Sequence, residues 1–238
     1  MGKDKTPSVP RTGAVTNDVA AFLQEVKSRP PVTTGGRGRL IFALDATMSR
    51  QPTWDLACAM QADMFKTVAA IGTLEVQLVY FRGFDECRAS SWMTDGSKLG
   101  ALMSKIDCRG GRTQIGRVLR HAVAQTEKGG VGAVVFVGDA MEEAIDALCS
   151  DAGPLALRGV PVFLFQEGHD SSAETAFKEI ARLTRGAWCK FDAGSADQLR
   201  ALLNAAASYA AGGTSALKAL ARSSDGARKL IAAMGSNK

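Results

Sequence analysis

The sequence predicts an α/β domain of the doubly wound, Rossmann-like class, with a mostly parallel sheet, one antiparallel edge strand and helices on both faces. Short apolar runs without charge recur along the chain, as expected for strands that are buried on both faces of a sheet. Between these runs, apolar residues recur at spacings of three and four, which is typical of amphipathic helices. The alternation of the two patterns indicates parallel strands joined by helices.

The expected elements follow one another from residue 40. Apolar runs predict strands at 40–44, 74–81, 87–92, 133–137, 160–165 and 187–191. Helical spacing predicts helices at 53–71, 97–106, 114–127, 171–184 and 195–211, and a short one that starts near 141. The strand at 87–92 follows its predecessor through Gly83-Phe84-Asp85, a short Gly-containing turn that predicts a hairpin. This hairpin supplies the antiparallel edge strand.

Three regions are expected along the chain. Residues 1–38 are predicted to be an N-terminal extension with a short helix and a Gly-rich linker, residues 39–211 the α/β domain, and residues 212–238 a basic helix beyond it. The net charge of +5 lies in the two ends, since the middle of the chain has more acidic than basic residues. Basic ends could bind nucleic acid or an acidic partner, or they could simply be solvated.

Several classes of protein are disfavoured by composition. No run of about 18 apolar residues occurs, so we expect no membrane span. The N-terminus carries early charges and no apolar segment, which favours a cytoplasmic protein. The five cysteines form no C-x-x-C pair, and only two histidines are present. This usage predicts neither a disulfide framework nor a zinc site, and it argues against most His-dependent catalysis.

Polar side chains follow two of the predicted strands and one Gly-Gly loop. Asp45, Thr47 and Ser49 come directly after the strand at 40–44, in the pattern D-x-T-x-S. Thr113 follows the Gly-Gly loop at the start of a helix, and Asp139 follows the strand at 133–137. Ligands of open α/β sheets bind at the carboxyl ends of strands, and hard cations such as Mg²⁺ prefer oxygen ligands. Each residue alone could be a helix cap or a turn former, but their joint placement at strand ends favours a metal site.

This arrangement resembles the von Willebrand factor type A domain and its metal-ion-dependent adhesion site, over roughly residues 38–211. The family motif is usually D-x-S-x-S, so Thr47 replaces a serine and keeps its hydroxyl. The family's third motif often reads T-D-G, whereas this chain has Gly138-Asp139-Ala140. The resemblance implies that Mg²⁺, or Mn²⁺ or Ca²⁺, is held by Asp45, Thr47, Ser49, Thr113 and Asp139. In that family the hydroxyls contact the cation directly and the aspartates often act through waters.

The resemblance also implies a function. We expect a non-enzymatic, metal-dependent protein-interaction module with an adaptor or assembly role, in which a partner protein supplies an Asp or Glu to the cation. Met48, Arg112 and Glu142 are expected to form the rim that contacts this partner.

Two alternatives stay open. Asp45 could be the nucleophile of a Mg²⁺-dependent phosphoryl-transfer enzyme, although Thr47 stands where haloacid-dehalogenase-like phosphatases have a second acidic residue. The chain could also bind nucleic acid through its basic ends, with an affinity that falls steeply with salt.

Overall fold

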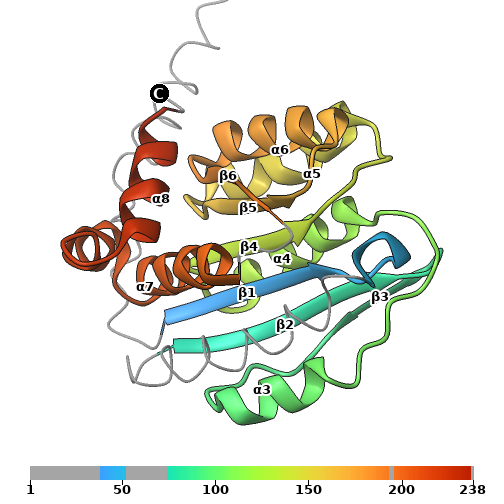
Figure 1. The fold of residues 1–238 in the computed structure, drawn as a ribbon, viewed down its shortest axis with the longest axis horizontal. Helices are drawn as coiled ribbons and strands as arrows, with labels where there is room; N and C mark the ends of the chain where they lie inside the picture. Colours follow the sequence, from blue (N-terminus) through green and yellow to red (C-terminus); the bar gives the residue numbers. More distant parts are fainter. Residues whose placement is uncertain (1–37, 52–73, 193–195, 237–238) are drawn as a thin grey trace, which may run out of the picture. The chain divides into compact units, whose positions relative to one another are not determined.

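The computed structural model of the chain describes residues 38–51, 74–192 and 196–236, all within a compact unit that spans Thr34–Lys238. The helices predicted near the N-terminus and at 53–71 lie outside these residues. The described part is a six-stranded sheet with helices on both faces (Figure 1). The predicted fold class is therefore confirmed.

The sheet has the strand order β3-β2-β1-β4-β5-β6. Its strands are β1 Gly38–Asp45, β2 Leu74–Arg82, β3 Glu86–Ala89, β4 Ala133–Gly138, β5 Val162–Glu167 and β6 Ala187–Phe191. All neighbours are parallel except β2 and β3, which form the predicted hairpin. The chain builds outward from β1 to β2 and β3 on one side, and then from β4 to β6 on the other. The carboxyl ends of β1 and β4 therefore form the switch point, where ligands of this architecture bind.

The helices join these strands as the amphipathic patterns predict. They are the 3₁₀ helix η1 Met48–Arg50, α3 Gly96–Met103, α4 Ile115–Gly129, α5 Ile145–Leu157, α6 Ser171–Thr184, α7 Ala196–Leu220 and α8 Asp225–Gly235. The bounds of α6 and β6 agree with the prediction. The helix predicted to be short and to start near residue 141 is wrong in both respects, because α5 begins at Ile145 and has 13 residues. It continues past Pro154, since Leu148 and Leu155 are buried against the sheet and anchor both halves.

Two separate cores flank the sheet, because successive side chains of a strand point to opposite faces. Along β1, Leu40, Phe42 and Leu44 belong to the core under α3, α7 and α8. Ile41 and Ala43 belong to the core under α4, α5 and α6. These side chains are almost fully buried, which holds β1 in the middle of the sheet and fixes the point at which it ends.

The C-terminal segment differs from the single basic helix predicted in residues 212–238. Helix α7 runs through a kink at Gly212–Gly213 to Leu220, and a turn separates it from α8. Gly213 has φ 63° and ψ −158°, a backbone conformation that glycine adopts readily because it has no Cβ and that other residues disfavour. Leu217 and Leu230 are fully buried in the core on this face. The two helices therefore pack on the sheet, while the domain boundaries at 38/39 and 211/212 stay a prediction.

None of the helices within the described ranges is both long enough and apolar enough to cross a membrane.

Candidate metal centre

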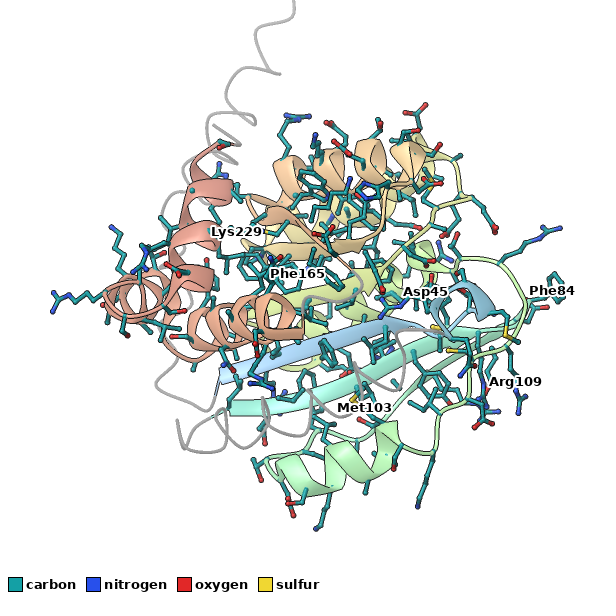
Figure 2. All side chains as sticks on the ribbon, viewed as in Figure 1. Asp45, Phe84, Met103, Arg109, Phe165 and Lys229 are labelled. Carbon is teal, nitrogen blue, oxygen red and sulfur yellow. The ribbon has the colours of Figure 1, made fainter. Side chains whose placement is uncertain are left out.

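The two aspartates of the predicted site follow neighbouring strands. Leu44 of β1 pairs with Val137 of β4, so the chain positions after them, Asp45 and Gly138–Asp139, come to the same edge of the sheet. Figure 2 shows Asp45 at the end of β1, with Phe84 and Arg109 farther out at the same end. The side chain of Asp45 is fully buried, and that of Asp139 is half-buried.

Each of these carboxylates has one buried oxygen without a hydrogen-bond partner in the described part of the chain. Asp45 Oδ1 accepts a hydrogen bond of 2.8 Å from the backbone N–H of Thr47, but Asp45 Oδ2 accepts none. Asp139 Oδ1 is also buried and unpartnered. Buried polar atoms nearly always have a hydrogen-bond partner, because a buried atom without one has lost its hydration and gained nothing in return. Two such atoms on neighbouring strand ends fit a bound cation.

The electrostatics of Asp45 agree with this interpretation. Burial raises the pKa of Asp45 to about 6, because the ionised carboxylate loses its hydration. Hydrogen bonds from Thr47 oppose this rise, the negative charge of Asp139 adds to it, and the positive charge of Arg50 opposes it. The protein groups around Asp45 therefore do not fully stabilise its negative charge. A divalent cation at this position would supply the missing stabilisation.

The two hydroxyls of the first motif lie together. Thr47 Oγ1 and Ser49 Oγ are 3.1 Å apart, and Thr47 is buried while Ser49 is exposed. Thr47 has an extended backbone, and η1 begins at the next residue. The chain therefore turns directly after β1 and returns Ser49 to the side of Thr47.

Thr113 is tied to the loop that follows β4. Its Oγ1 accepts a hydrogen bond of 3.1 Å from the backbone N–H of Glu142, and its own N–H donates one of 3.3 Å to Glu142 Oε2. The loop that carries Thr113 is also bonded to the loop after β1, through the N–H of Arg109 and the carbonyl of Ala46 at 3.0 Å. The three segments that carry the predicted ligands are thus joined to one another.

Glu142 and Glu143 have roles that the sequence did not predict. Acidic residues just before a helix commonly stabilise the start of that helix, which here is α5. Glu143 instead accepts hydrogen bonds from the N–H groups of Ile115 at 2.6 Å and Gly116 at 2.9 Å, and so caps the preceding helix α4. A carboxylate at this end also stabilises the helix dipole. Glu142, expected at the rim, is exposed but also positions Thr113.

Sequence reasoning missed a buried ion pair at the site. Arg50, directly after the first motif, is only 1% exposed, and its Nε lies 3.2 Å from Oε2 of the buried Glu167. The two residues are far apart in the sequence, and β1 and β5 are not neighbours in the sheet. Nothing in the local pattern distinguishes Arg50 from a solvated arginine.

The other two rim residues lie at the surface. Met48 is 53% exposed on η1. Arg112 is exposed, and its guanidinium lies 6.0 Å from the centre of the Phe84 ring.

The donor set is that of a hard cation. No group of three or more His, Cys, Asp or Glu side chains able to hold a metal occurs within the described ranges. The predicted set instead combines two carboxylates with three hydroxyls, Thr47, Ser49 and Thr113. Oxygen-only sets of this kind suit Mg²⁺, Mn²⁺ or Ca²⁺ better than softer metals.

Comparison with known proteins gives structural relatives only. No family model and no curated protein matches the sequence. Among solved structures, a von Willebrand factor type A protein from Catenulispora acidiphila matches with a TM-score of 0.58 and 16% identity, over 73% of this chain and 43% of that one. Proximal thread matrix protein 1 from the mussel byssus, with a zinc-occupied MIDAS motif, matches with a TM-score of 0.59 and 17% identity, over 72% of this chain and 48% of that one.

A third solved structure matches a similar share of this chain. The SpRpn10 VWA domain matches with a TM-score of 0.55 and 12% identity, over 68% of this chain and 95% of that domain. The chain thus spans less than half of the first two relatives and nearly all of the isolated domain. At these identities the likeness establishes the fold alone.

Proposed function

Starting from the von Willebrand factor type A fold that this chain has, we propose that it is a metal-dependent protein-interaction module. Asp45, Thr47, Ser49, Thr113 and Asp139 would hold a divalent cation, with Mg²⁺ as the first candidate and Mn²⁺ or Ca²⁺ as alternatives. The cation would accept an Asp or Glu side chain of a partner protein, and the chain would act as an adaptor or assembly factor. The cytoplasmic location expected from the sequence stays a prediction.

One observation carries this proposal: the unpartnered buried oxygens Asp45 Oδ2 and Asp139 Oδ1 at adjacent strand ends. A cation would supply the missing partner to both. Asp45 and Asp139 would balance the charge of a divalent cation, and the three hydroxyls are neutral, so they would complete the coordination without adding negative charge and would leave the cation a Lewis acid. Such a cation can attract a carboxylate from outside. A solved structure of this fold with a zinc-occupied MIDAS motif supports a divalent metal at this kind of site.

An interaction module is favoured over a phosphoryl-transfer enzyme by the burial of Asp45. A nucleophilic carboxylate must reach the phosphorus atom of its substrate, whereas the Asp45 side chain is fully buried and one oxygen is engaged by Thr47. Turnover of a generic aryl phosphate that disappears in Asp45→Asn would favour the enzyme instead. Binding of nucleic acid through the basic ends is tested separately, by the salt dependence of RNA binding before and after those ends are trimmed.

The proposal is tested by calorimetric titration of Mg²⁺ and Mn²⁺ into the full chain. We expect one saturable site in the natural sequence and none in Asp139→Asn. Asp170→Asn is the matched control, because Asp170 follows β5 at the same edge of the sheet but its Oδ1 already accepts a hydrogen bond from Ala173 N–H. Equal binding by the natural chain and Asp139→Asn would overturn the proposed site.

A further inference from the structure

The turn between β2 and β3 exposes an aromatic side chain beside the candidate metal centre. Phe84 is 69% exposed, more than any other large hydrophobic side chain of the described residues. It projects from the end of the sheet at which Asp45 lies (Figure 2). Exposing an aromatic ring of this size forfeits hydrophobic free energy, which contact with a partner would recover.

The backbone that carries Phe84 is held firmly. The carbonyl of Gly83 accepts hydrogen bonds from Arg112 N–H at 3.1 Å and from Gln114 Nε2 at 3.2 Å. Gly111 packs directly on this carbonyl, since a Cβ there would lie 2.0 Å from Gly83 O. The turn is therefore held by the same loop that carries Thr113, which positions the backbone of Phe84 relative to that proposed ligand.

Positive charge surrounds Phe84. A single carboxylate, Glu86, is shared by Arg82, Arg88 and Arg109, with N–O distances of 3.0, 2.9 and 3.7 Å. Arg117 lies 3.7 Å from Asp85, and Arg82 lies 3.9 Å from Asp107. With Arg112 over the Phe84 ring, these five arginines face three acidic residues, and Glu142, bonded to the N–H of Thr113 next to Arg112, adds a fourth carboxylate, which leaves an excess of one positive charge.

We propose that Phe84, Arg109 and Arg112, named here the Phe84 face, bind an acidic segment of a partner protein that carries an apolar side chain. This inference rests on the proposed function, because the same segment would supply the carboxylate for the cation. Charge complementarity selects an acidic partner, and the exposed ring selects an apolar contact next to it. Aromatic and arginine side chains are the residues that most often dominate binding energy at protein interfaces.

A nucleic acid fits this surface less well. Asp85, Glu86 and Asp107 are interleaved with the arginines, and they would repel a continuous phosphate backbone. Discrete carboxylates on a peptide can instead be spaced to avoid them.

The inference is tested with random short peptides displayed on phage and selected on the full chain in the presence of Mn²⁺. Enriched peptides are then synthesised with a fluorescent label, and their dissociation constants are measured by anisotropy. We expect the enriched peptides to combine Asp or Glu with an aromatic or aliphatic residue. Phe84→Ser and Arg112→Gln should each weaken their binding by roughly tenfold, as expected for residues near the centre of an interface.

Two matched variants control for general effects of exposed residues. Leu157→Ser removes an apolar side chain that is 63% exposed at the end of α5, and Arg222→Gln removes an exposed arginine after α7. Both should bind the peptides as the natural chain does. Circular dichroism of all four variants checks that they fold.

A parallel measurement in EDTA separates the two proposals. If EDTA abolishes peptide binding while Phe84→Ser and Arg112→Gln bind normally, the Phe84 face is wrong and the metal site stands. If these variants lose binding and EDTA has no effect, the Phe84 face stands and the metal-dependent function is wrong. Failure to enrich any peptide over the Phe84→Ser variant would overturn the Phe84 face. It would equally be overturned if a short single-stranded RNA bound and Arg112→Gln abolished that binding.

Discussion

Buried polar groups near the ends of the strands differ in whether their hydrogen bonds are made. In the half formed by β5 and β6, Gln166 is fully buried and both ends of its amide are used. Its Nε2 donates to the carbonyl of Asp170 at 2.7 Å, and its Oε1 accepts from Trp188 Nε1 at 2.9 Å. At the ends of β1 and β4, in contrast, Asp45 and Asp139 each keep one buried oxygen without a partner among the described residues.

The difference separates polar groups that hold the fold from polar groups that are kept for a ligand. A satisfied amide such as that of Gln166 fixes the positions of α6 and β6, and its removal should cost stability. An unsatisfied carboxylate such as that of Asp45 costs stability while it is present. Substitutions in the two halves should therefore change the free energy of unfolding in opposite directions.

The largest effect is expected for Asp45→Asn. The variant lacks one of the two carboxylates proposed to balance the cation. Its affinity for Mn²⁺ should therefore fall on the order of 100-fold, the upper end of the loss that substitutions around a metal site cause. In EDTA the same variant should be more stable than the natural chain, by roughly 1–3 kcal/mol at neutral pH, because an amide is cheaper to bury than a carboxylate. Calorimetry measures the first quantity and urea denaturation the second. A loss of stability in EDTA would mean that Asp45 has a structural partner and that the comparison fails.

A pH series sharpens the same contrast. The pKa of Asp45 is 3.8 in a free chain and about 6 in the fold, so between these values the folded state binds more protons than the unfolded state. The metal-free protein should therefore lose stability as pH rises from about 4 to about 6, by up to roughly 1.4 kcal/mol per pH unit from this group. Above about pH 6 the loss is complete and constant.

The measurement compares urea denaturation of the natural chain and Asp45→Asn in EDTA, since their difference isolates this group. Mn²⁺ binding by the natural chain should weaken as pH falls below about 6, because the cation competes with the proton for Asp45. If the difference in the free energy of unfolding between the two proteins did not change from about pH 4 to about pH 6, the proposed titration of Asp45 would be ruled out.

In the other half of the sheet, Gln166→Leu should lower the free energy of unfolding by about 1–2 kcal/mol. The substitution leaves the indole N–H of Trp188 and the carbonyl of Asp170 without their present partners. Thermal or urea denaturation measures the loss. Mn²⁺ affinity should stay unchanged, and a parallel fall in affinity would show that the two halves are coupled.

The smallest effect is expected for Glu143→Gln. The two carboxylate oxygens of Glu143 accept from Ile115 N–H and Gly116 N–H, so the single amide oxygen of Gln can still accept from only one of them, and the charge that favours the start of α4 is lost. A decrease of up to about 1 kcal/mol in the free energy of unfolding is expected. Glu127→Gln is a suitable control, since Glu127 lies near the opposite end of the same helix.

The elements whose patterns are local could be predicted from the sequence. The strand at 187–191 and the helix at 171–184 have the predicted bounds, because period-two and helical spacing are repeated within each segment. The bounds of α5 could not be predicted, since Pro154 usually ends a helix and only the burial of Leu155 against the sheet explains why α5 continues past it. The break between α7 and α8 likewise depends on contacts with the sheet.

The candidate site shows the same limit. Four of its residues could be chosen from the sequence because they follow strands whose carboxyl ends share an edge, and Thr113 because it follows a Gly-Gly loop at the start of a helix. The role of all five as ligands stays a prediction. The pairing of Arg50 with Glu167 and the cap of α4 by Glu143 join segments that are distant in the sequence. No local pattern indicates such pairs, because a charged residue after a strand is usually solvated.

The position of β1 and β4 in the middle of the sheet has a mechanical consequence. Each strand is hydrogen-bonded to a parallel neighbour on both sides. A partner that pulled on a cation at Asp45 and Asp139 along the strand direction would load two complete ladders of hydrogen bonds in shear. Bonds loaded in shear must break together, whereas bonds at the edge hairpin could open one after another. The load would thus enter the domain where it resists tension best.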